Sequence, residues 1–240
     1  VQVFSPYGAT EALPVASIGS DEVLLKTAVE TAGGAGVCIG RPVPPNRVEI
    51  IPIGDAPIES WKEDLIVEEG AVGEIAVKGP TVTARYYNRE QATSLAKIPD
   101  PSGGFWHRMG DLGYRDEEGR IWFSGRKTQR VETPSGPRYT TMCEGIFNAH
   151  PAVYRSALVG VPHHAAPGQR RGTICVELEP DSDAVDRTRL VEELGALAHK
   201  YEMTREVSEF LVHPGFPVDI RHNAKIGREE LARWATKELS

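Results

Sequence analysis

The sequence predicts an α/β protein of two units, a strand-rich first piece followed by a small α+β domain. Before about residue 126, short apolar runs alternate with turn-forming residues, which is typical of strands and turns. Farther along, apolar residues recur at helical spacing over 187–202 and 228–239. At the boundary, near 126–138, "RKTQRVETPSGPRY" is polar and holds two prolines and a glycine. That composition suits a linker or a hinge.

The first unit reads as strands joined by irregular segments. Residues 1–20 predict a strand followed by a loop, and "TAGGAGVCIGRPVPPN" (31–46) is too rich in Gly and Pro for one regular element. Strands are expected at "VEIIPI" (48–53) and "GEIAVKG" (73–79). A hairpin is expected over 113–125, because the polar loop "DEEG" separates two apolar runs.

The second unit reads as alternating helices and strands. Thr141 and Glu144 have capping-box spacing, which predicts a helix that ends near His150. Buried strands are expected at "YRSALVGVP" and "RGTICVELE", a further strand at "SEFLVHP", and helices at about 187–202 and from Arg228 to Leu239. The first of these two helices carries Leu190, Leu194 and Ala198 on one face.

Composition excludes several classes of function. Forty percent apolar and 25% charged residues are ordinary for a soluble globular protein, and a net charge of −7 argues against a non-specific nucleic-acid binder. Cys38, Cys143 and Cys175 are far apart and lack metal-ligand spacing, which favours a reducing cytoplasm. No run approaches the roughly 18 apolar residues that span a bilayer, so we do not expect an integral membrane protein. The chain opens on Val1, which suggests a fragment.

The stretch "YGATE" gathers four kinds of ligand chemistry in five positions. Gly8 allows a ligand close to the backbone, and the Thr10 hydroxyl suits a phosphate oxygen. Glu11 is a hard carboxylate that suits Mg²⁺, and Tyr7 offers a flat face for adenine. These are the needs of an ATP site. A plainer interpretation stays open, namely a strand end and an N-capped turn with Tyr7 in the core.

Three further residues carry weaker signals. Asp111 lies between glycines in "GDLG", where a carboxylate could accept both hydroxyls of a ribose, and Arg126 could reach the same ribose or a phosphate. Lys225 precedes the last helix in a predicted loop, where its charge suits a transferring phosphoryl group. The alternatives are a turn aspartate, a surface arginine and a solvated lysine. His163 and His164 are read as loop residues that titrate in a useful range but are solvated.

The order of these motifs resembles the adenylate-forming superfamily, which includes acyl-CoA synthetases, luciferases and non-ribosomal adenylation domains. The resemblance rests on "YGATE", "GEIAVKGPTVTARYYN", "WHRMGDLGYRDEEGRIWFSGRK", "HPAV" and "NAKIGREEL", in that order. It implies that 1–127 is the C-terminal part of the large adenylation domain, including its small β-barrel subdomain. It implies a small mobile α+β C-terminal domain over 128–240.

The resemblance also implies roles for the singled-out residues. Tyr7 would stack on adenine, Thr10 would contact the α-phosphate and Glu11 would hold Mg²⁺. Asp111 and Arg126 would bind the ribose, and Lys225 would bridge carboxylate and α-phosphate. The domain hinge would fall at Thr128, where the family usually has Asp or Lys, and Ala224 stands where a glycine commonly precedes the lysine.

The stretches "SPYGATEALPVA" and "FPVDIRHNAKIGREEL" are most similar to one branch, the β-lactone synthetases of bacterial long-chain olefin biosynthesis. That branch implies ATP- and Mg²⁺-dependent adenylation of a long-chain 3-hydroxy fatty acid, then closure to a β-lactone with release of AMP. Other enzymes of the olefin pathway would be its partners. A long-chain acyl-CoA ligase that uses coenzyme A is the alternative. A non-catalytic nucleotide-binding module is the second.

Overall fold

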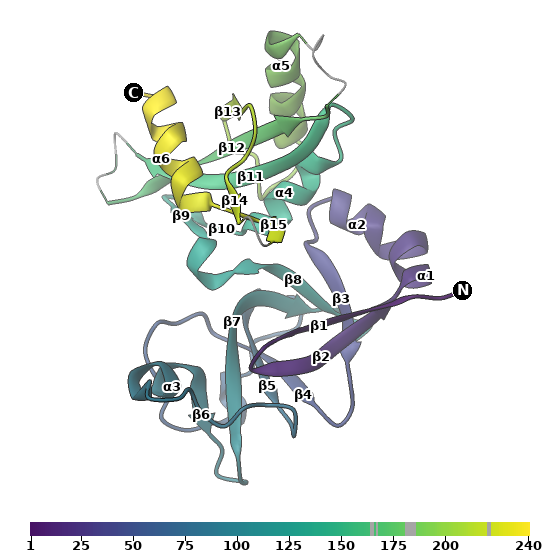
Figure 1. Ribbon diagram of the computed structural model, residues 1–240, viewed down its shortest axis with the longest axis vertical. Coiled ribbons are helices and arrows are strands. Elements are labelled where there is room, and N and C mark those ends of the chain that lie inside the picture. Colours follow the sequence, from purple (N-terminus) through teal and green to yellow (C-terminus); the bar gives the residue numbers. More distant parts are fainter. Residues whose placement is uncertain (164–165, 167, 181–185, 220–221) are drawn as a thin grey trace. The chain divides into compact units, whose positions relative to one another are not determined.

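The computed structural model describes residues 1–163, 166, 168–180, 186–219 and 222–240, and the chain divides into two compact units. The first unit comprises Val1–Ala28 and Gly36–Thr128, and the second comprises Val29–Ala35 and Gln129–Ser240. Figure 1 shows the course of the chain through the elements of each unit. None of the helices in the described part of the chain has the length and apolarity needed to cross a membrane.

An antiparallel sheet dominates the first unit. Its strands follow the order β1-β2-β3-β8-β7-β5-β4, and β6 pairs with β7 (Figure 1). Their bounds are β1 Phe4–Ala9, β2 Ala12–Gly19, β3 Val37–Pro42, β4 Arg47–Ile51, β5 Gly73–Lys78, β6 Lys97–Pro99, β7 Phe105–Arg115 and β8 Ile121–Arg126. Among the described residues this sheet is open, ending at β1 and β4, so the expected closure into a barrel is not seen.

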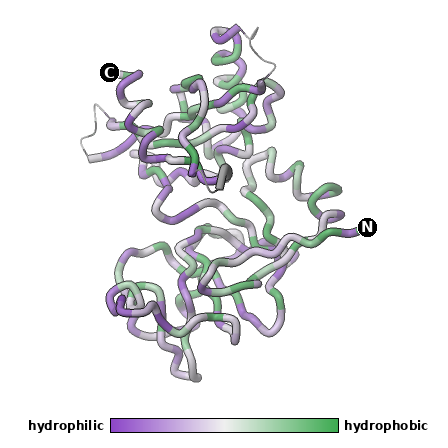
Figure 2. The backbone as a smooth tube through the Cα atoms, viewed as in Figure 1, coloured by the Kyte–Doolittle hydropathy of each residue, from purple (hydrophilic) through white to green (hydrophobic). Residues whose placement is uncertain are grey.

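Short helical segments lie between or just after these strands in sequence. They are α1 (Ser20–Glu22), the π-helix η1 (Val23–Thr27), α2 (Ala28–Ala32), η2 (Glu63–Leu65), α3 (Glu90–Ala96) and η3 (Lys127–Gln129). All but the first residue of α2, and the last residue of η3, belong to the second unit. The stretch from η1 into α2 is apolar in Figure 2, and Leu24 and Leu25 are exposed on it. None of these segments was predicted from the sequence, and α1, η1 and α2 follow one another without a break.

The predicted strands at 48–53 and 73–79 are confirmed as β4 and β5, and the predicted hairpin as β7 and β8. The loop expected within 1–20 is wrong, because Ala12–Gly19 forms a second strand. Thr10 and Glu11 make the turn between β1 and β2, with Ala9 and Ala12 paired across it. Gly40 lets β3 approach β2, since a Cβ there would lie 1.9 Å from the Ser17 carbonyl oxygen.

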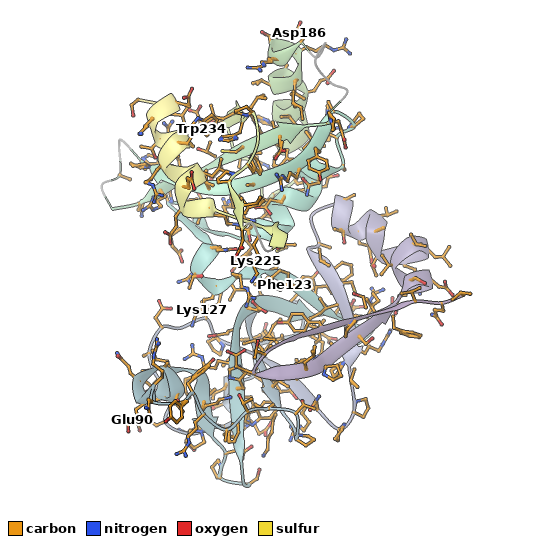
Figure 3. The ribbon with its side chains drawn as sticks, in the orientation of Figure 1. Glu90, Phe123, Lys127, Asp186, Lys225 and Trp234 are labelled. Atoms are coloured by element: carbon orange, nitrogen blue, oxygen red, sulfur yellow. The ribbon has the colours of Figure 1, made fainter. Side chains whose placement is uncertain are left out.

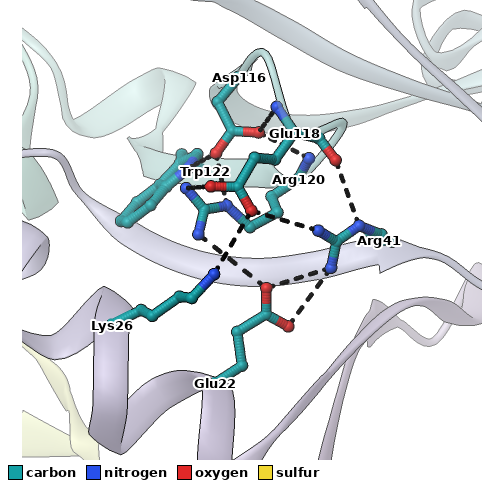
Figure 4. Close-up of polar contacts among 7 residues, drawn as sticks. All are labelled: Glu22, Lys26, Arg41, Asp116, Glu118, Arg120 and Trp122. Atoms are coloured by element: carbon teal, nitrogen blue, oxygen red, sulfur yellow. Dashed lines mark hydrogen bonds and ion pairs between the residues drawn. The ribbon is translucent and has the colours of Figure 1, made fainter.

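The β7–β8 turn is held by the side chain of Asp116 (Figure 4). Its Oδ1 accepts the backbone N–H groups of Glu118 and Arg120 at 3.0 and 2.8 Å. Its Oδ2 accepts from Arg120 Nε at 2.6 Å and from Trp122 Nε1 at 2.7 Å. Four acceptor contacts on one carboxylate fix the hairpin register that places Asp111 opposite Arg126.

The second unit is a three-stranded sheet with helices on both faces. Its order is β11-β12-β13, antiparallel and then parallel. The elements are β9 (Val131–Thr133), β10 (Gly136–Arg138), α4 (Thr140–Asn148), β11 (Val153–Pro162), β12 (Arg170–Leu178), α5 (Arg187–Ala198), β13 (Glu209–Val212), β14 (Val218–Asp219), β15 (His222–Ile226) and α6 (Arg228–Glu238). All strands and helices expected after residue 140 are present.

Alternation along β11 decides which helix covers which face. Leu158 packs in one cluster with residues of α4 and α5, whereas Ala157 and Val159 pack with Leu231 of α6. Successive strand residues point to opposite faces, so β11 contributes side chains to a hydrophobic core on each face of the sheet.

The polar stretch 126–138, expected to be a linker or a hinge, contains the hairpin of β9 and β10. A local prediction in this unit is wrong. The capping box does not form, since Tyr139 is the N-cap residue of α4 and no side chain caps this end. Glu144 instead forms an ion pair with Arg228, at 2.5 Å between Oε1 and Nη1, and accepts the Leu158 N–H at 2.8 Å.

Candidate functional site

Three of the predicted nucleotide ligands meet in the first unit. Tyr7 comes from β1, Asp111 from β7 and Arg126 from β8. The Tyr7 hydroxyl donates to Asp111 Oδ2 at 2.5 Å, and Arg126 Nη1 lies 2.7 Å from Asp111 Oδ1. We call these residues the Tyr7 cluster. Sequence reasoning assigned each residue separately. Antiparallel pairing sets Asp111 opposite Arg126, and the Tyr7 hydroxyl reaches Asp111 from 104 positions away.

Burial sets the electrostatics of the Tyr7 cluster. Asp111 is only 3% exposed, and this desolvation raises the pKa of its carboxyl, against the Tyr7 hydrogen bond and the Arg126 charge. Burial and the adjacent Asp111 also raise the pKa of the Tyr7 hydroxyl. The Arg126 side chain is 52% exposed, so a ligand from solvent can reach its guanidinium. The Tyr7 ring lies 6.3 Å from that of Phe123, which Figure 3 labels.

The β1–β2 turn presents the two predicted phosphate and metal ligands. The Thr10 side chain is exposed, and Glu11 is half-buried. Gly8 lies just before the turn, where a Cβ would come within 2.5 Å of the Ala12 carbonyl oxygen. The structure therefore places Gly8, Thr10 and Glu11 on the same hairpin as Tyr7.

The surroundings of Glu11 lower the pKa of its side chain and so favour the ionised carboxylate. Burial raises its pKa, but a hydrogen bond from its own backbone, the Tyr86 hydroxyl and the neighbouring His107 and Lys97 outweigh it, so the net pKa is lowered. Tyr86 donates to Glu11 Oε1 at 3.0 Å. The described residues contain no group of three His, Cys, Asp or Glu side chains that could hold a metal ion. A lone carboxylate fits Mg²⁺, which usually keeps several waters and takes its other ligands from substrate phosphates.

Two buried basic residues near Glu11 were missed by the sequence analysis. Burial lowers the pKa of Lys97 to about 8, and its Nζ donates to the Thr83 carbonyl oxygen at 2.5 Å. Burial also lowers the pKa of His107 to about 4, with Nδ1 3.2 Å from the Ala96 carbonyl oxygen. Only the tertiary fold buries these side chains, so no local pattern marks them.

A surface pocket of about 630 Å³ lies beside α3. Ile58, Tyr86 and Tyr87 give it apolar surface, and Arg89 and Lys97 line it as well. Its volume is within the range of small-molecule sites. Tyr86 thus borders both this pocket and the Glu11 carboxylate.

The remaining predicted residues lie at the end of the first unit and in the second. Thr128 is the last residue of the first unit, directly after Lys127, whose Nζ lies 3.2 Å from Glu74 Oε1. Lys225 belongs to the second unit and has an exposed side chain. The expectation that Lys225 lies in a loop is wrong, because it is part of β15 (Figure 3). His163 follows β11, and His164 lies outside the described residues.

The chain is similar to two curated proteins over nearly its whole length. It is 51% identical to an olefin beta-lactone synthetase of Xanthomonas campestris pv. campestris, over 99% of this chain and 43% of that protein. It is also 51% identical to an olefin beta-lactone synthetase of Stenotrophomonas maltophilia, with the same coverage of both. The chain therefore spans less than half the length of these relatives. No family model matches it.

Solved structures share the fold. The amide bond synthetase McbA from Marinactinospora thermotolerans matches 96% of this chain and 42% of that chain, with a TM-score of 0.75 and 24% identity. The o-succinylbenzoate CoA synthetase of Bacillus subtilis, in complex with its acyl-adenylate intermediate, matches 95% of this chain and 40% of that chain, with a TM-score of 0.70 and 22% identity. The fold of this chain is that of adenylate-forming enzymes.

Proposed function

We propose that this chain, which is homologous to the olefin beta-lactone synthetases, forms the nucleotide-binding and C-terminal part of an AMP-forming ligase. The observation that carries the proposal is the meeting of Tyr7, Asp111 and Arg126 on one sheet, beside the turn that presents Thr10 and Glu11. An aromatic ring, a carboxylate and a guanidinium suit an adenosine. A hydroxyl and a carboxylate one turn away suit its phosphates and their Mg²⁺.

In the first step, an oxygen of the substrate carboxylate attacks the α-phosphorus of ATP and pyrophosphate leaves. The Thr10 hydroxyl donates to an α-phosphate oxygen, and the Lys225 ammonium offsets the charge that develops there. Mg²⁺ held at Glu11 supplies further charge neutralisation when bound. The first step yields an acyl-adenylate. In this mechanism a hinge at Thr128 lets the 128–240 domain bring Lys225 to the nucleotide, and that motion stays a prediction.

In the second step, the 3-hydroxyl oxygen of the same acyl chain attacks the activated carbonyl carbon, and the bond to AMP breaks. The hydroxyl proton passes to solvent water, AMP departs with the electron pair of the broken bond, and a β-lactone ring closes. Holding the hydroxyl in line can supply roughly 7–11 kcal/mol of the barrier through proximity. The proposed substrate is a long-chain 3-hydroxy fatty acid, and the proposed setting is the cytoplasm, beside other enzymes of an olefin pathway.

A second candidate is acyl-CoA ligation, in which a thiol attacks the same adenylate. It is favoured by a 2-succinylbenzoate–CoA ligase of Bacillus mycoides, 31% identical over 67% of this chain and 29% of that protein. A non-catalytic nucleotide-binding module is the remaining alternative.

The test is to incubate the full-length protein with ATP, Mg²⁺ and a long-chain 3-hydroxy acid, with and without coenzyme A. We expect pyrophosphate release and a product with the mass of the acid less one water, independent of coenzyme A. Turnover that demands coenzyme A would overturn the lactone step. ATP binding with no pyrophosphate from any fatty acid would favour the non-catalytic module.

A further inference from the structure

The segment that follows β5 returns to the β1–β2 turn and contacts its backbone. The Thr83 N–H donates to the Glu11 carbonyl oxygen at 2.8 Å, and Val82 bridges Ala12. These contacts bring Tyr86, 75 positions away in sequence, within reach of the Glu11 side chain. The turn is thus supported by chain that the "YGATE" motif does not contain.

Tyr86 is itself held in place by α3. Its backbone N–H donates to Thr93 Oγ1 at 3.1 Å, and the Thr93 hydroxyl donates in turn to the Arg89 carbonyl oxygen at 2.9 Å. One hydroxyl thereby accepts one hydrogen bond and donates another, as its chemistry allows. The position of the Tyr86 ring is consequently fixed from the backbone side.

The Tyr86 hydroxyl contacts only one oxygen of the Glu11 carboxylate, Oε1, at 3.0 Å. Oε2 accepts no hydrogen bond from another residue in the described part of the chain. A carboxylate that is anchored through one oxygen keeps its other oxygen oriented toward an incoming cation. Groups that hydrogen-bond to metal ligands in this way commonly set their orientation and affinity.

We propose that Tyr86 is a positioning residue, which anchors Oε1 of Glu11 and leaves Oε2 to bind the divalent metal of the nucleotide. This inference rests on the proposed function, because it takes Glu11 to be the metal ligand. It adds a residue from outside the "YGATE" turn to the metal site. It also gives the α3 segment a role in the first step, through Thr93 and Tyr86.

The test uses the full-length protein with α,β-methylene-ATP, which cannot release pyrophosphate, and Mn²⁺ as a spectroscopic stand-in for Mg²⁺. Electron paramagnetic resonance measures the Mn²⁺ affinity of the protein–nucleotide complex. Tyr86→Phe should weaken that affinity about tenfold, in line with other residues that support a metal ligand. Affinity for the analogue without metal should be unchanged.

The adjacent tyrosine provides a matched control. Tyr87 is 89% exposed, so Tyr87→Phe removes the same hydroxyl from a ring that no packing holds and should change neither affinity. Thr93→Val removes the acceptor of the Tyr86 N–H and should weaken Mn²⁺ binding in the same direction, by less. If Tyr86→Phe fails to fold, an unchanged Mn²⁺ affinity in Thr93→Val overturns the proposal.

Glu11→Gln separates this inference from the proposed function. If Glu11→Gln leaves Mn²⁺ binding intact, Glu11 is not the metal ligand and the proposed function loses its metal site. If Glu11→Gln weakens Mn²⁺ binding but Tyr86→Phe does not, only the role of Tyr86 is overturned. If both act, the double variant should bind Mn²⁺ no worse than Glu11→Gln alone, because Tyr86 acts through Glu11.

Discussion

The Tyr7 cluster and the β1–β2 turn hold their polar side chains in different ways. At the Tyr7 cluster both oxygens of Asp111 are engaged, by a hydroxyl and by a guanidinium, and the carboxylate is buried. At the turn, Glu11 receives one side-chain hydrogen bond, from Tyr86, and the Thr10 side chain is exposed. The cluster resembles a prearranged docking surface, and the turn is left open for ligands.

The difference also concerns positive charge. The Tyr7 cluster carries its own cation, since Arg126 pairs with Asp111. No ion pair reaches Glu11 among the described residues, and the nearby Lys97 directs its Nζ at the Thr83 carbonyl oxygen. A turn that binds phosphates needs a further cation when charge develops. In the proposed mechanism that cation is Lys225 of the second unit.

The largest effect is therefore expected from Lys225→Ala. Removing a group that stabilises developing charge should lower the rate of adenylation roughly 10²–10³-fold. ATP affinity should change little, because in the proposed mechanism the Tyr7 cluster holds the nucleoside without Lys225. Pyrophosphate release and equilibrium ATP binding measure the two quantities. Lys237→Ala, on α6 of the same unit, is the control. Equal losses of rate and affinity would contradict the assigned role.

The lowered pKa of His107 predicts that the free energy of unfolding depends on pH. Burial holds the pKa of His107 near 4, below its ordinary value of 6.5. Between these values the unfolded chain binds more protons, so stability is complete above pH 6.5 and falls as the pH drops toward 4. The loss should reach about 3 kcal/mol.

Urea unfolding of the full-length protein between pH 4 and 7 measures this effect. His107→Gln should remove most of the pH-dependent difference, since a glutamine does not titrate. The exposed His199 provides the control, and His199→Gln should keep the wild-type slope. An unchanged slope in His107→Gln would show that His107 binds protons alike in the folded and unfolded chains.

Asp111→Asn should separate binding from folding at the Tyr7 cluster. Burial raises the pKa of Asp111, so the folded protein disfavours its charge and a neutral amide should be tolerated. We expect the free energy of unfolding to change by less than about 1 kcal/mol. ATP affinity should fall about tenfold or more, because a charged acceptor for the ribose is lost. A large stability loss with intact ATP affinity would make Asp111 a structural residue.

The sequence pointed to candidate ligands but not to their surroundings. Tyr7, Asp111 and Arg126 were assigned through the resemblance. The register of β7 with β8 sets Asp111 opposite Arg126, whereas the approach of Tyr7 to Asp111 comes from the tertiary fold, because β1 does not pair with β7. Local patterns also predicted the longer strands and helices, where apolar periodicity is strong. They failed where structure depends on distant partners. The hairpin within 126–138 is short and polar. Lys97 and His107 have shifted pKa values because the tertiary fold buries them, and Tyr86 meets Glu11 from 75 positions away.

Tyr7→Phe should have the smallest effect, and it tests directly whether the Tyr7 cluster is prearranged. The change removes the hydroxyl that donates to Asp111 Oδ2 but keeps the ring, and the ring is the part proposed to stack on adenine. We expect the free energy of unfolding to fall by about 1 kcal/mol, as for a typical lost hydrogen bond. ATP affinity should decline only a few-fold, as judged by calorimetry with the full-length protein. Tyr154→Phe, on an exposed ring of the second unit, is the control. If Tyr7→Phe abolished ATP binding, the hydroxyl would be a direct ligand of the nucleotide, and the Tyr7 cluster would be no more prearranged than the turn.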